Sequence, residues 1–66
     1  MNTIILNGDP RKTAAVSVVE LLQELELPLS IVLVEQNGLA LHRHELEKAP
    51  LAEGDKIEIL KVAAGG

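Results

Sequence analysis

The 66-residue sequence contains no cysteine and no phenylalanine, tryptophan or tyrosine. Without cysteine the chain forms no disulfide and holds no thiolate-bound metal, so its composition does not call for an oxidising compartment. Without aromatic rings it offers no platform on which nucleic-acid bases can stack. Its net charge of -4 also repels phosphate backbones. We therefore expect a cytoplasmic protein that binds no nucleic acid and whose surface favours basic protein partners.

Long hydrophobic runs are also missing. The apolar run Ile31 to Val34 is far too short to span a bilayer, and no basic segment followed by an apolar stretch begins the chain. The sequence predicts a soluble protein without a membrane partner. Its length predicts one small domain with an aliphatic core, in which a large enzymatic cleft is not expected.

The residues that would carry catalysis lack suitable neighbours. The hydroxyl side chains have no activating partner, and Ser17 is better explained as a helix cap. Gly8, Gly38 and Gly54 lie in separate turns, so they do not form a phosphate-binding loop. His42 and His44 with nearby glutamates suggest a metal only weakly, because zinc sites normally have three or four well-placed ligands. We favour a solvated loop there, and predict neither an enzyme nor a metal site.

Turn and cap signals divide the first half of the chain. Thr3 to Leu6 followed by Asn7-Gly8 predicts a hairpin that returns over Arg11 to Ala14, with Asp9-Pro10 lengthening the loop. Ser17 and Glu20 form a predicted capping box, with the glutamate bonding back to the Ser17 N–H, so a helix begins at Val18. Its apolar stripe is Val18, Leu21, Leu22 and Leu25.

Strand signals dominate the second half. Ile31 to Val34 predicts a central strand covered on both faces, and Asn37-Gly38 predicts a turn into Leu39 to Leu41. His42 to Ala49 has no clear period and suggests an irregular connection or a short helical turn. After the turn at Glu53 to Asp55, alternation over the last strand points Ile57 and Ile59 inward.

The same alternation places Leu60 and Val62 on the other face, beside the end of the chain. They are a candidate docking patch, and the alternative is scattered surface hydrophobes, which are ordinary. Gly65-Gly66 ends the sequence after Ala63-Ala64. Because glycine lacks a Cβ, this segment suits a narrow slot in another enzyme, although a frayed terminus gives the same composition.

The element order of hairpin, helix, central strand, short strand and last strand predicts an α+β fold of the β-grasp type. We expect a mixed sheet of four to five strands covered by one helix. Residues 1–62 would form the domain, and residues 63–66 a flexible C-terminal diglycine tail.

These features together resemble the sulfur carrier proteins of thiamine biosynthesis, the ThiS family. The resemblance extends over the whole chain and rests on the stretches SVVELL, VEQNG, LAEGDKIEIL and the terminal AAGG. Leu39 to His42 departs from the charged-valine-valine-proline pattern that is typical after Asn-Gly, while Arg43 stands where the pattern has its arginine. This departure concerns the partner surface and leaves the terminal chemistry unchanged.

The resemblance implies a ubiquitin-like β-grasp fold and the role of a protein cosubstrate. A ubiquitin-activating-type adenylyltransferase (ThiF-like) would convert the Gly66 carboxylate into an acyl-adenylate, and a persulfide sulfur donor would turn it into a thiocarboxylate. A thiazole synthase (ThiG-like) would then receive the sulfur. Ala63, Ala64, Gly65 and Gly66 would thread into both active sites. No cofactor is expected on the chain beyond the acyl-adenylate or thiocarboxylate at Gly66.

Three alternatives remain open at this point. The chain could carry sulfur for another pathway, such as molybdopterin or cysteine synthesis, because the fold is shared among such carriers. It could be a ubiquitin-like modifier whose terminal glycine forms isopeptide bonds. It could also be a noncovalent β-grasp binding module in which Leu60 and Val62 dominate the affinity.

Overall fold

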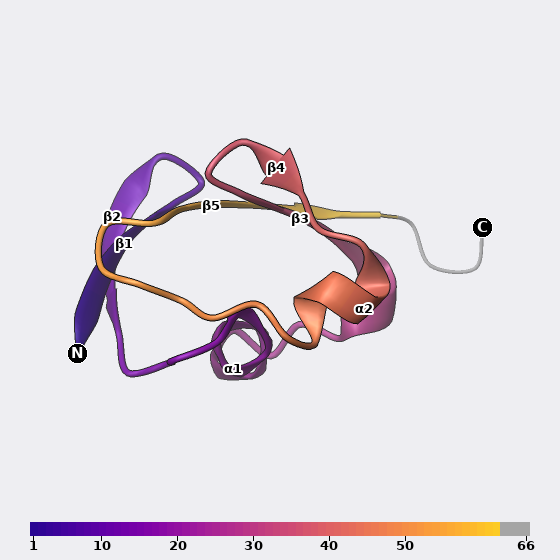
Figure 1. Cartoon of the computed structure of the whole chain (residues 1–66), viewed down its shortest axis with the longest axis horizontal. Coiled ribbons are helices and arrows are strands. Elements are labelled where there is room, and N and C mark those ends of the chain that lie inside the picture. The colour runs from indigo at the N-terminus through magenta and orange to yellow at the C-terminus, as the bar shows by residue number, and fades with distance from the viewer. Residues whose placement is uncertain (63–66) are drawn as a thin grey trace.

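The computed structural model describes residues 1–62, in which five strands form one mixed sheet (Figure 1). The strand order across the sheet is β2-β1-β5-β3-β4, so the last strand lies in the middle. β1 and β5 are parallel, and the other neighbouring strands are antiparallel. The elements in chain order are β1 (Asn2–Leu6), β2 (Asp9–Thr13), α1 (Val18–Glu24), a 3-10 turn (Leu29–Ile31), β3 (Val32–Gln36), β4 (Leu39–Ala40), α2 (Arg43–Leu46) and β5 (Lys56–Lys61).

Both helices lie on the same side of the sheet, as Figure 1 shows. The buried side chains come from α1, the inward faces of the strands, and the segments before and after the helices; they are Ile4, Ala15, Val18, Leu21, Leu22, Val32, Val34, Leu46, Ala49, Leu51 and Ile57. Ile59 is half-buried against this core, so both isoleucines of the last strand point inward as predicted. In residues 1–62 no helix is long and apolar enough to cross a membrane.

The two Asn-Gly turns form as predicted, and each is two residues long. Asn7 and Asn37 have φ of 48° and 52°, and the glycine after each has φ near 90°, at 88° and 86°. Such left-handed pairs match the twist of the flanking strands. The prediction that Asp9-Pro10 lengthens the first loop is wrong, because Asp9 already pairs with Leu6 in β2. Pro10 is tolerated there because β2 is an edge strand.

The side chains of both turn asparagines hold β5 in place. Asn7 Oδ1 accepts from the Ile59 N–H at 2.8 Å, and Asn7 Nδ2 donates to the Ile59 carbonyl at 3.3 Å. Asn37 Oδ1 accepts from the Lys56 N–H at 2.9 Å. The β1–β5 pairing ends at Leu6 and Ile57, so the side-chain amide of Asn7 continues the ladder where the backbone of β1 turns away. β5 is therefore anchored from both neighbouring turns.

The start of α1 follows the prediction with one change. Ser17 Oγ accepts from the Glu20 N–H at 3.1 Å, which is the expected N-cap bond. Glu20 Oε1, however, accepts from the Val16 N–H at 3.1 Å rather than from the Ser17 N–H, so the predicted return bond is wrong by one residue. Val18, Leu21 and Leu22 are buried and Leu25 is partly buried, which confirms the predicted apolar stripe.

The end of α1 comes before Pro28, at a Schellman motif that uses glutamate in place of glycine. The Leu27 N–H donates to the Leu22 carbonyl at 2.9 Å, and the Glu26 N–H donates to the Gln23 carbonyl at 3.0 Å. These two hydrogen bonds form only when the residue just after the helix cap is left-handed. Glu26 is that residue, and its φ is 60°. A side chain in that conformation costs about 1 kcal/mol or more relative to glycine.

We therefore expect Glu26→Gly to stabilise the protein by about 0.5–1 kcal/mol, because relief of the left-handed strain exceeds the extra entropy of glycine in the unfolded chain. The free energy of unfolding in urea is the measurement. Glu47→Gly is the matched control, because Glu47 caps α2 with an ordinary right-handed φ of -66°. This variant should be less stable than the natural protein. A loss of stability in Glu26→Gly would contradict this account of the helix end.

The prediction that the run Ile31 to Val34 is covered on both faces is wrong. Val32 and Val34 are buried, but Leu33 between them is 58% exposed. β3 also lies between β5 and the two-residue β4, and the middle of the sheet belongs to β5. The apolar run reflects one buried face and one exposed leucine on the other. The segment after β4 contains α2, which agrees with the short helical turn considered for it.

Asp55 joins the loop before β5 to the turn after β3. Its two carboxylate oxygens accept from Gln36 Nε2 at 3.0 Å, Asn37 Nδ2 at 3.0 Å and the Ala52 N–H at 2.9 Å. Burial by itself raises the pKa of Asp55, but the hydrogen bonds from Asn37, Ala52 and Gln36 outweigh it and hold the pKa below the ordinary value. The ionised form therefore stabilises the fold.

The sign of the pH dependence follows from this lowered pKa. A carboxyl whose folded pKa is below its unfolded value contributes stability above about pH 4, and the contribution is lost as the pH falls through the folded pKa. We expect Asp55→Asn to cost about 1–3 kcal/mol at pH 7, since an amide cannot accept from all three donors. Urea unfolding of both proteins at pH 7 and pH 3 should show the difference shrinking in acid. A pH-independent difference would contradict the assigned role.

Candidate functional site

The side of the sheet opposite the helices carries an exposed apolar strip. We call this side the outer face. Leu33 of β3 and Leu60 of β5 are directly opposite in the register, and they are 58% and 62% exposed. Val62, two residues beyond Leu60, is 37% exposed. The exposure of Leu60 agrees with the alternation in the sequence, whereas Val62 borders a hollow with the core residues Val32 and Leu46. The role of both residues in docking stays a prediction.

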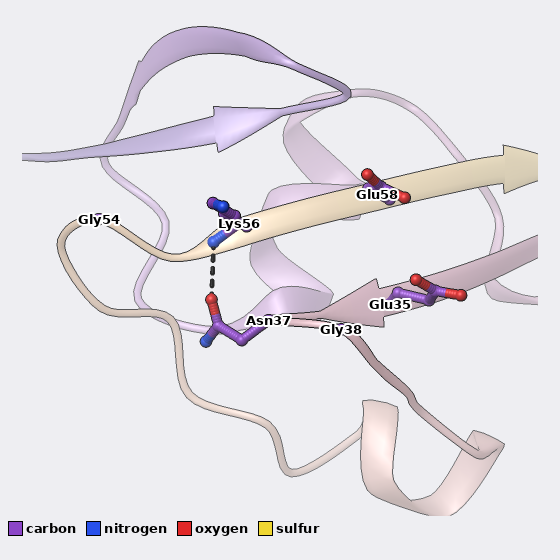
Figure 2. A pocket seen from close by; sticks show the side chains of 6 residues that line it. All are labelled: Glu35, Asn37, Gly38, Gly54, Lys56 and Glu58. Carbon is purple, nitrogen blue, oxygen red and sulfur yellow. Dashed lines mark hydrogen bonds between the residues drawn. The ribbon is translucent and has the colours of Figure 1, made fainter.

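Two glutamates continue this strip along the same pair of strands. Glu35 of β3 is directly opposite Glu58 of β5, one cross-strand pair on from Leu33 and Leu60 on the outer face. Figure 2 shows the two carboxylates side by side on their strands, with Lys56 nearer the start of β5. Both glutamates are exposed. The one ion pair found in residues 1–62 joins Arg11 to Glu24, on another part of the surface, so neither outer-face carboxylate has a counterion there.

The outer face is also hollowed where these groups meet. One depression is lined by Leu33, Glu35, Ala40, Leu41, Glu58 and Leu60, among others. A second one, drawn in Figure 2, reaches from Glu35 and Glu58 to the turns at Gly38 and Gly54. The apolar strip and the acid pair therefore border one continuous shallow surface on β3 and β5.

The strand that carries this surface is also the strand that leads to the end of the chain. β5 ends at Lys61, and the Val62 N–H donates to the Ile31 carbonyl at 2.8 Å. The predicted tail residues Ala63, Ala64, Gly65 and Gly66 lie outside the described residues. The outer face is thus fixed in position up to the residue before them.

The two histidines lie at the start of α2. Their rings are stacked, with centroids 6.2 Å apart and planes 8° from parallel. The His42 N–H donates to Glu45 Oε1 at 2.8 Å, so this glutamate serves the helix start. Within residues 1–62, no group of three or more histidine, aspartate or glutamate side chains is placed to hold a metal ion.

A sequence model of the ThiS family matches residues 4–66, which is almost the entire chain. The chain belongs to the ThiS family. The match includes β5, the outer face and the terminal glycines, and it confirms the resemblance drawn from the sequence motifs.

Relatives of this ThiS chain support the same assignment. The sulfur carrier protein ThiS of Thermus thermophilus is 34% identical over 61 residues, which cover 92% of this chain and 95% of that protein. The crystal structure of the thiamine biosynthesis protein ThiS from Geobacter metallireducens matches with a TM-score of 0.80 and 31% identity, over 97% of this chain and 99% of that one. A solution structure of a thiamine biosynthesis protein from the same organism matches with a TM-score of 0.79 and 33% identity, over 100% of this chain and 88% of that one.

The predicted ubiquitin-like β-grasp fold is confirmed by these structures together with the mixed five-stranded sheet. The sequence reasoning missed three outer-face residues, namely Leu33, Glu35 and Glu58. Leu33 was hidden inside an apolar run, and the two glutamates were grouped with the general acidic surface. The cross-strand register was needed to find them, because it joins residues more than 20 positions apart in the sequence.

Proposed function

We propose that this protein is a sulfur carrier for thiazole formation in thiamine biosynthesis, and that its Gly66 carboxylate is the group that carries the sulfur. The observation that supports this most strongly is the ThiS family match, which extends through the terminal Gly65-Gly66. The relatives named as sulfur carrier and thiamine biosynthesis proteins point the same way. The protein acts as a cosubstrate of other enzymes.

The first step is activation of the carboxylate. A carboxylate is a poor acyl donor, because its leaving group would be an oxide ion. Attack of the Gly66 carboxylate on the α-phosphorus of ATP forms an acyl-adenylate and releases pyrophosphate, which gives the acyl carbon a good leaving group. An adenylyltransferase of the ubiquitin-activating type supplies this step. We assign the nucleotide site to that enzyme; the glycines of residues 1–62 lie in separate turns and form no phosphate-binding loop.

The second step exchanges oxygen for sulfur. The terminal sulfur of a persulfide donor attacks the acyl carbon, AMP leaves, and an acyl disulfide is formed. A second thiol then cleaves the sulfur–sulfur bond; that thiol is oxidised to a disulfide with the donor, and Gly66 is left as a thiocarboxylate. The thiocarboxylate retains a negative charge and gains a soft nucleophilic sulfur, which a thiazole synthase takes up.

The role of the folded domain is to present the tail to these enzymes. β5 is anchored by Asn7 on one side and by Asn37 on the other, so the strand before the tail is held in a fixed position. The exposed leucines beside it offer an apolar surface of the kind that partner proteins cover. Recognition and chemistry are thus divided between the outer face and Gly66.

The activation step is tested by ATP–pyrophosphate exchange. The protein and an adenylyltransferase of this type should together incorporate labelled pyrophosphate into ATP, and omission of either should abolish the exchange. The enzyme's activity is established separately with its own carrier. No exchange with this chain and an enzyme shown to be active would overturn the proposed activation of Gly66.

A further inference from the structure

We propose that the outer face docks a partner protein that places one arginine across Glu35 and Glu58 and apolar side chains over Leu33 and Leu60. The inference rests on the proposed function, because the partner we commit to is the enzyme that activates the tail. It adds which residues select that partner and what chemistry the partner must present. Glu35 and Glu58 are assigned as specificity-determining residues.

The acid pair is unfavourable in the free protein. Side chains directly opposite on antiparallel strands have Cβ atoms about 4.5–5.5 Å apart, and like charges at that distance are destabilising. Glu35 and Glu58 occupy such a pair. Lys56, two residues before Glu58 on β5, forms no ion pair with either carboxylate in residues 1–62. No ion pair within residues 1–62 therefore offsets this repulsion, which a cation from a partner would relieve.

Arginine fits this pair better than lysine does. The planar guanidinium has five N–H donors in a fixed fork, so one group can donate to two neighbouring carboxylates at once. Its weak hydration also lowers the cost of burying it in an interface. The ammonium of lysine is a compact, strongly hydrated point charge and cannot span both acids as well.

The neighbouring leucines set the rest of the partner's chemistry. Leu33 and Leu60 form the next cross-strand pair on the same face, and a single hollow borders both pairs. Covering the leucines removes water from around the carboxylates, which strengthens their interaction with a guanidinium. The occupant must therefore combine an arginine with an apolar rim.

A second copy of this chain does not meet that requirement. In a twofold dimer through the outer face, the same acid pair would face itself or the exposed leucines of the other copy. Neither arginine of the chain lies at its own acid pair: Arg11 is committed to Glu24 at 2.8 Å, and Arg43 of α2 borders a separate hollow with Leu33 and Val62. Charge complementarity thus selects a different protein.

The test uses the double variant Glu35→Gln/Glu58→Gln, which keeps the shape of the pair and removes its charge. Its matched control is Asp9→Asn/Glu47→Gln, which makes the same change in net charge at exposed sites away from the strip. Binding of each full-length chain to the adenylyltransferase is measured by isothermal titration calorimetry, and the thermal midpoint of each chain is measured alone.

We expect the double variant to bind about tenfold to a hundredfold more weakly than the natural sequence, while its thermal midpoint rises because the repulsion is gone. The control should bind within about threefold of the natural sequence. Unchanged binding of the double variant, or equal weakening in the control, would overturn the assignment. The assignment would also be overturned if the natural chain formed a detectable dimer and the double variant changed the strength of that dimer.

Failure of this inference is distinguishable from failure of the proposed function. If the natural chain supports ATP–pyrophosphate exchange and the double variant does so with the same half-saturating concentration, the carrier role stands and the acid pair has no part in docking. If the natural chain binds the enzyme but gives no exchange, the proposed activation fails. A raised half-saturating concentration with an unchanged maximal rate would support the docking role.

Discussion

Deletion of Gly66 is expected to abolish adenylation and sulfur loading while leaving the domain folded. The deletion moves the terminal carboxylate back by one residue, about 3.5 Å along an extended chain, and catalysis requires the reacting atoms to be placed far more closely than that. We expect at least a hundredfold loss of exchange activity. The thermal midpoint should hardly change, because every fully buried side chain of the described residues lies between Ile4 and Ile57.

The companion variant Gly66→Val separates position from bulk. It retains the carboxylate at the right distance and adds a branched side chain, which a narrow channel for glycine does not admit. The same loss of exchange with unchanged stability is expected. Ala14→Val, at an exposed position remote from the tail, is the control for the added bulk. Normal adenylation of Gly66→Val would contradict the idea that the terminal segment enters a narrow site.

Replacement of Leu60 by serine is expected to weaken partner binding by about 1–3 kcal/mol, or roughly tenfold to a hundredfold. Serine removes the apolar side chain without adding charge beside Glu58. Leu60 is 62% exposed in the free protein, so the free energy of unfolding of the variant should differ from that of the natural protein by less than about 1 kcal/mol. The two quantities are measured by calorimetric titration against the adenylyltransferase and by urea unfolding.

Val16→Ser is the matched control for Leu60→Ser. Val16 is 63% exposed and lies just before α1, away from the outer face. It should bind the enzyme as tightly as the natural sequence does. Equal weakening in both variants would mean that general surface hydrophobicity, and not the strip on β3 and β5, governs docking. A large loss of stability in Leu60→Ser would show that the side chain supports the fold.

Local signals carried most of the fold that could be predicted from sequence. Asn7-Gly8 and Asn37-Gly38 were recognisable because few residue pairs accept two successive positive φ angles. Ser17 at the start of α1 and the spacing of its leucines were equally local. These features depend on residues within one turn or one element, so the sequence shows them directly.

The missed features depend on contacts between distant segments or on strain that leaves no sequence trace. Glu26 ends α1 in a left-handed conformation although glutamate gives no such signal. Leu33 looked buried because an exposed leucine within an apolar run has the same letter as a core residue. The pairing of Glu35 with Glu58 exists only once the register of β3 and β5 is known.

In the candidate site, too, local features could be predicted from the sequence and contacts between distant segments could not. Leu60 and Val62 were found by counting alternate residues along one strand from Ile57; the structure leaves Leu60 62% exposed, whereas Val62 is 37% exposed and borders a hollow with the core residues Val32 and Leu46. Their neighbours across the sheet could not be found in this way. The bonds from Asn7 and Asn37 that anchor β5 also connect residues 52 and 19 positions apart. The sequence thus predicts which side chains of one strand share a face, but it does not predict which residues lie opposite them on the neighbouring strands.

The most direct test of the carrier role is the intact mass of the protein after incubation with ATP, the adenylyltransferase, a persulfide donor and a reducing thiol. The account predicts that one oxygen is replaced by one sulfur, and that fragmentation places the change on Gly66. The Gly66 deletion variant, treated in the same way, should keep its mass. An unchanged mass for the natural chain, with an enzyme and donor shown to be active on another carrier, would contradict the central claim that this protein carries sulfur on its terminal carboxylate.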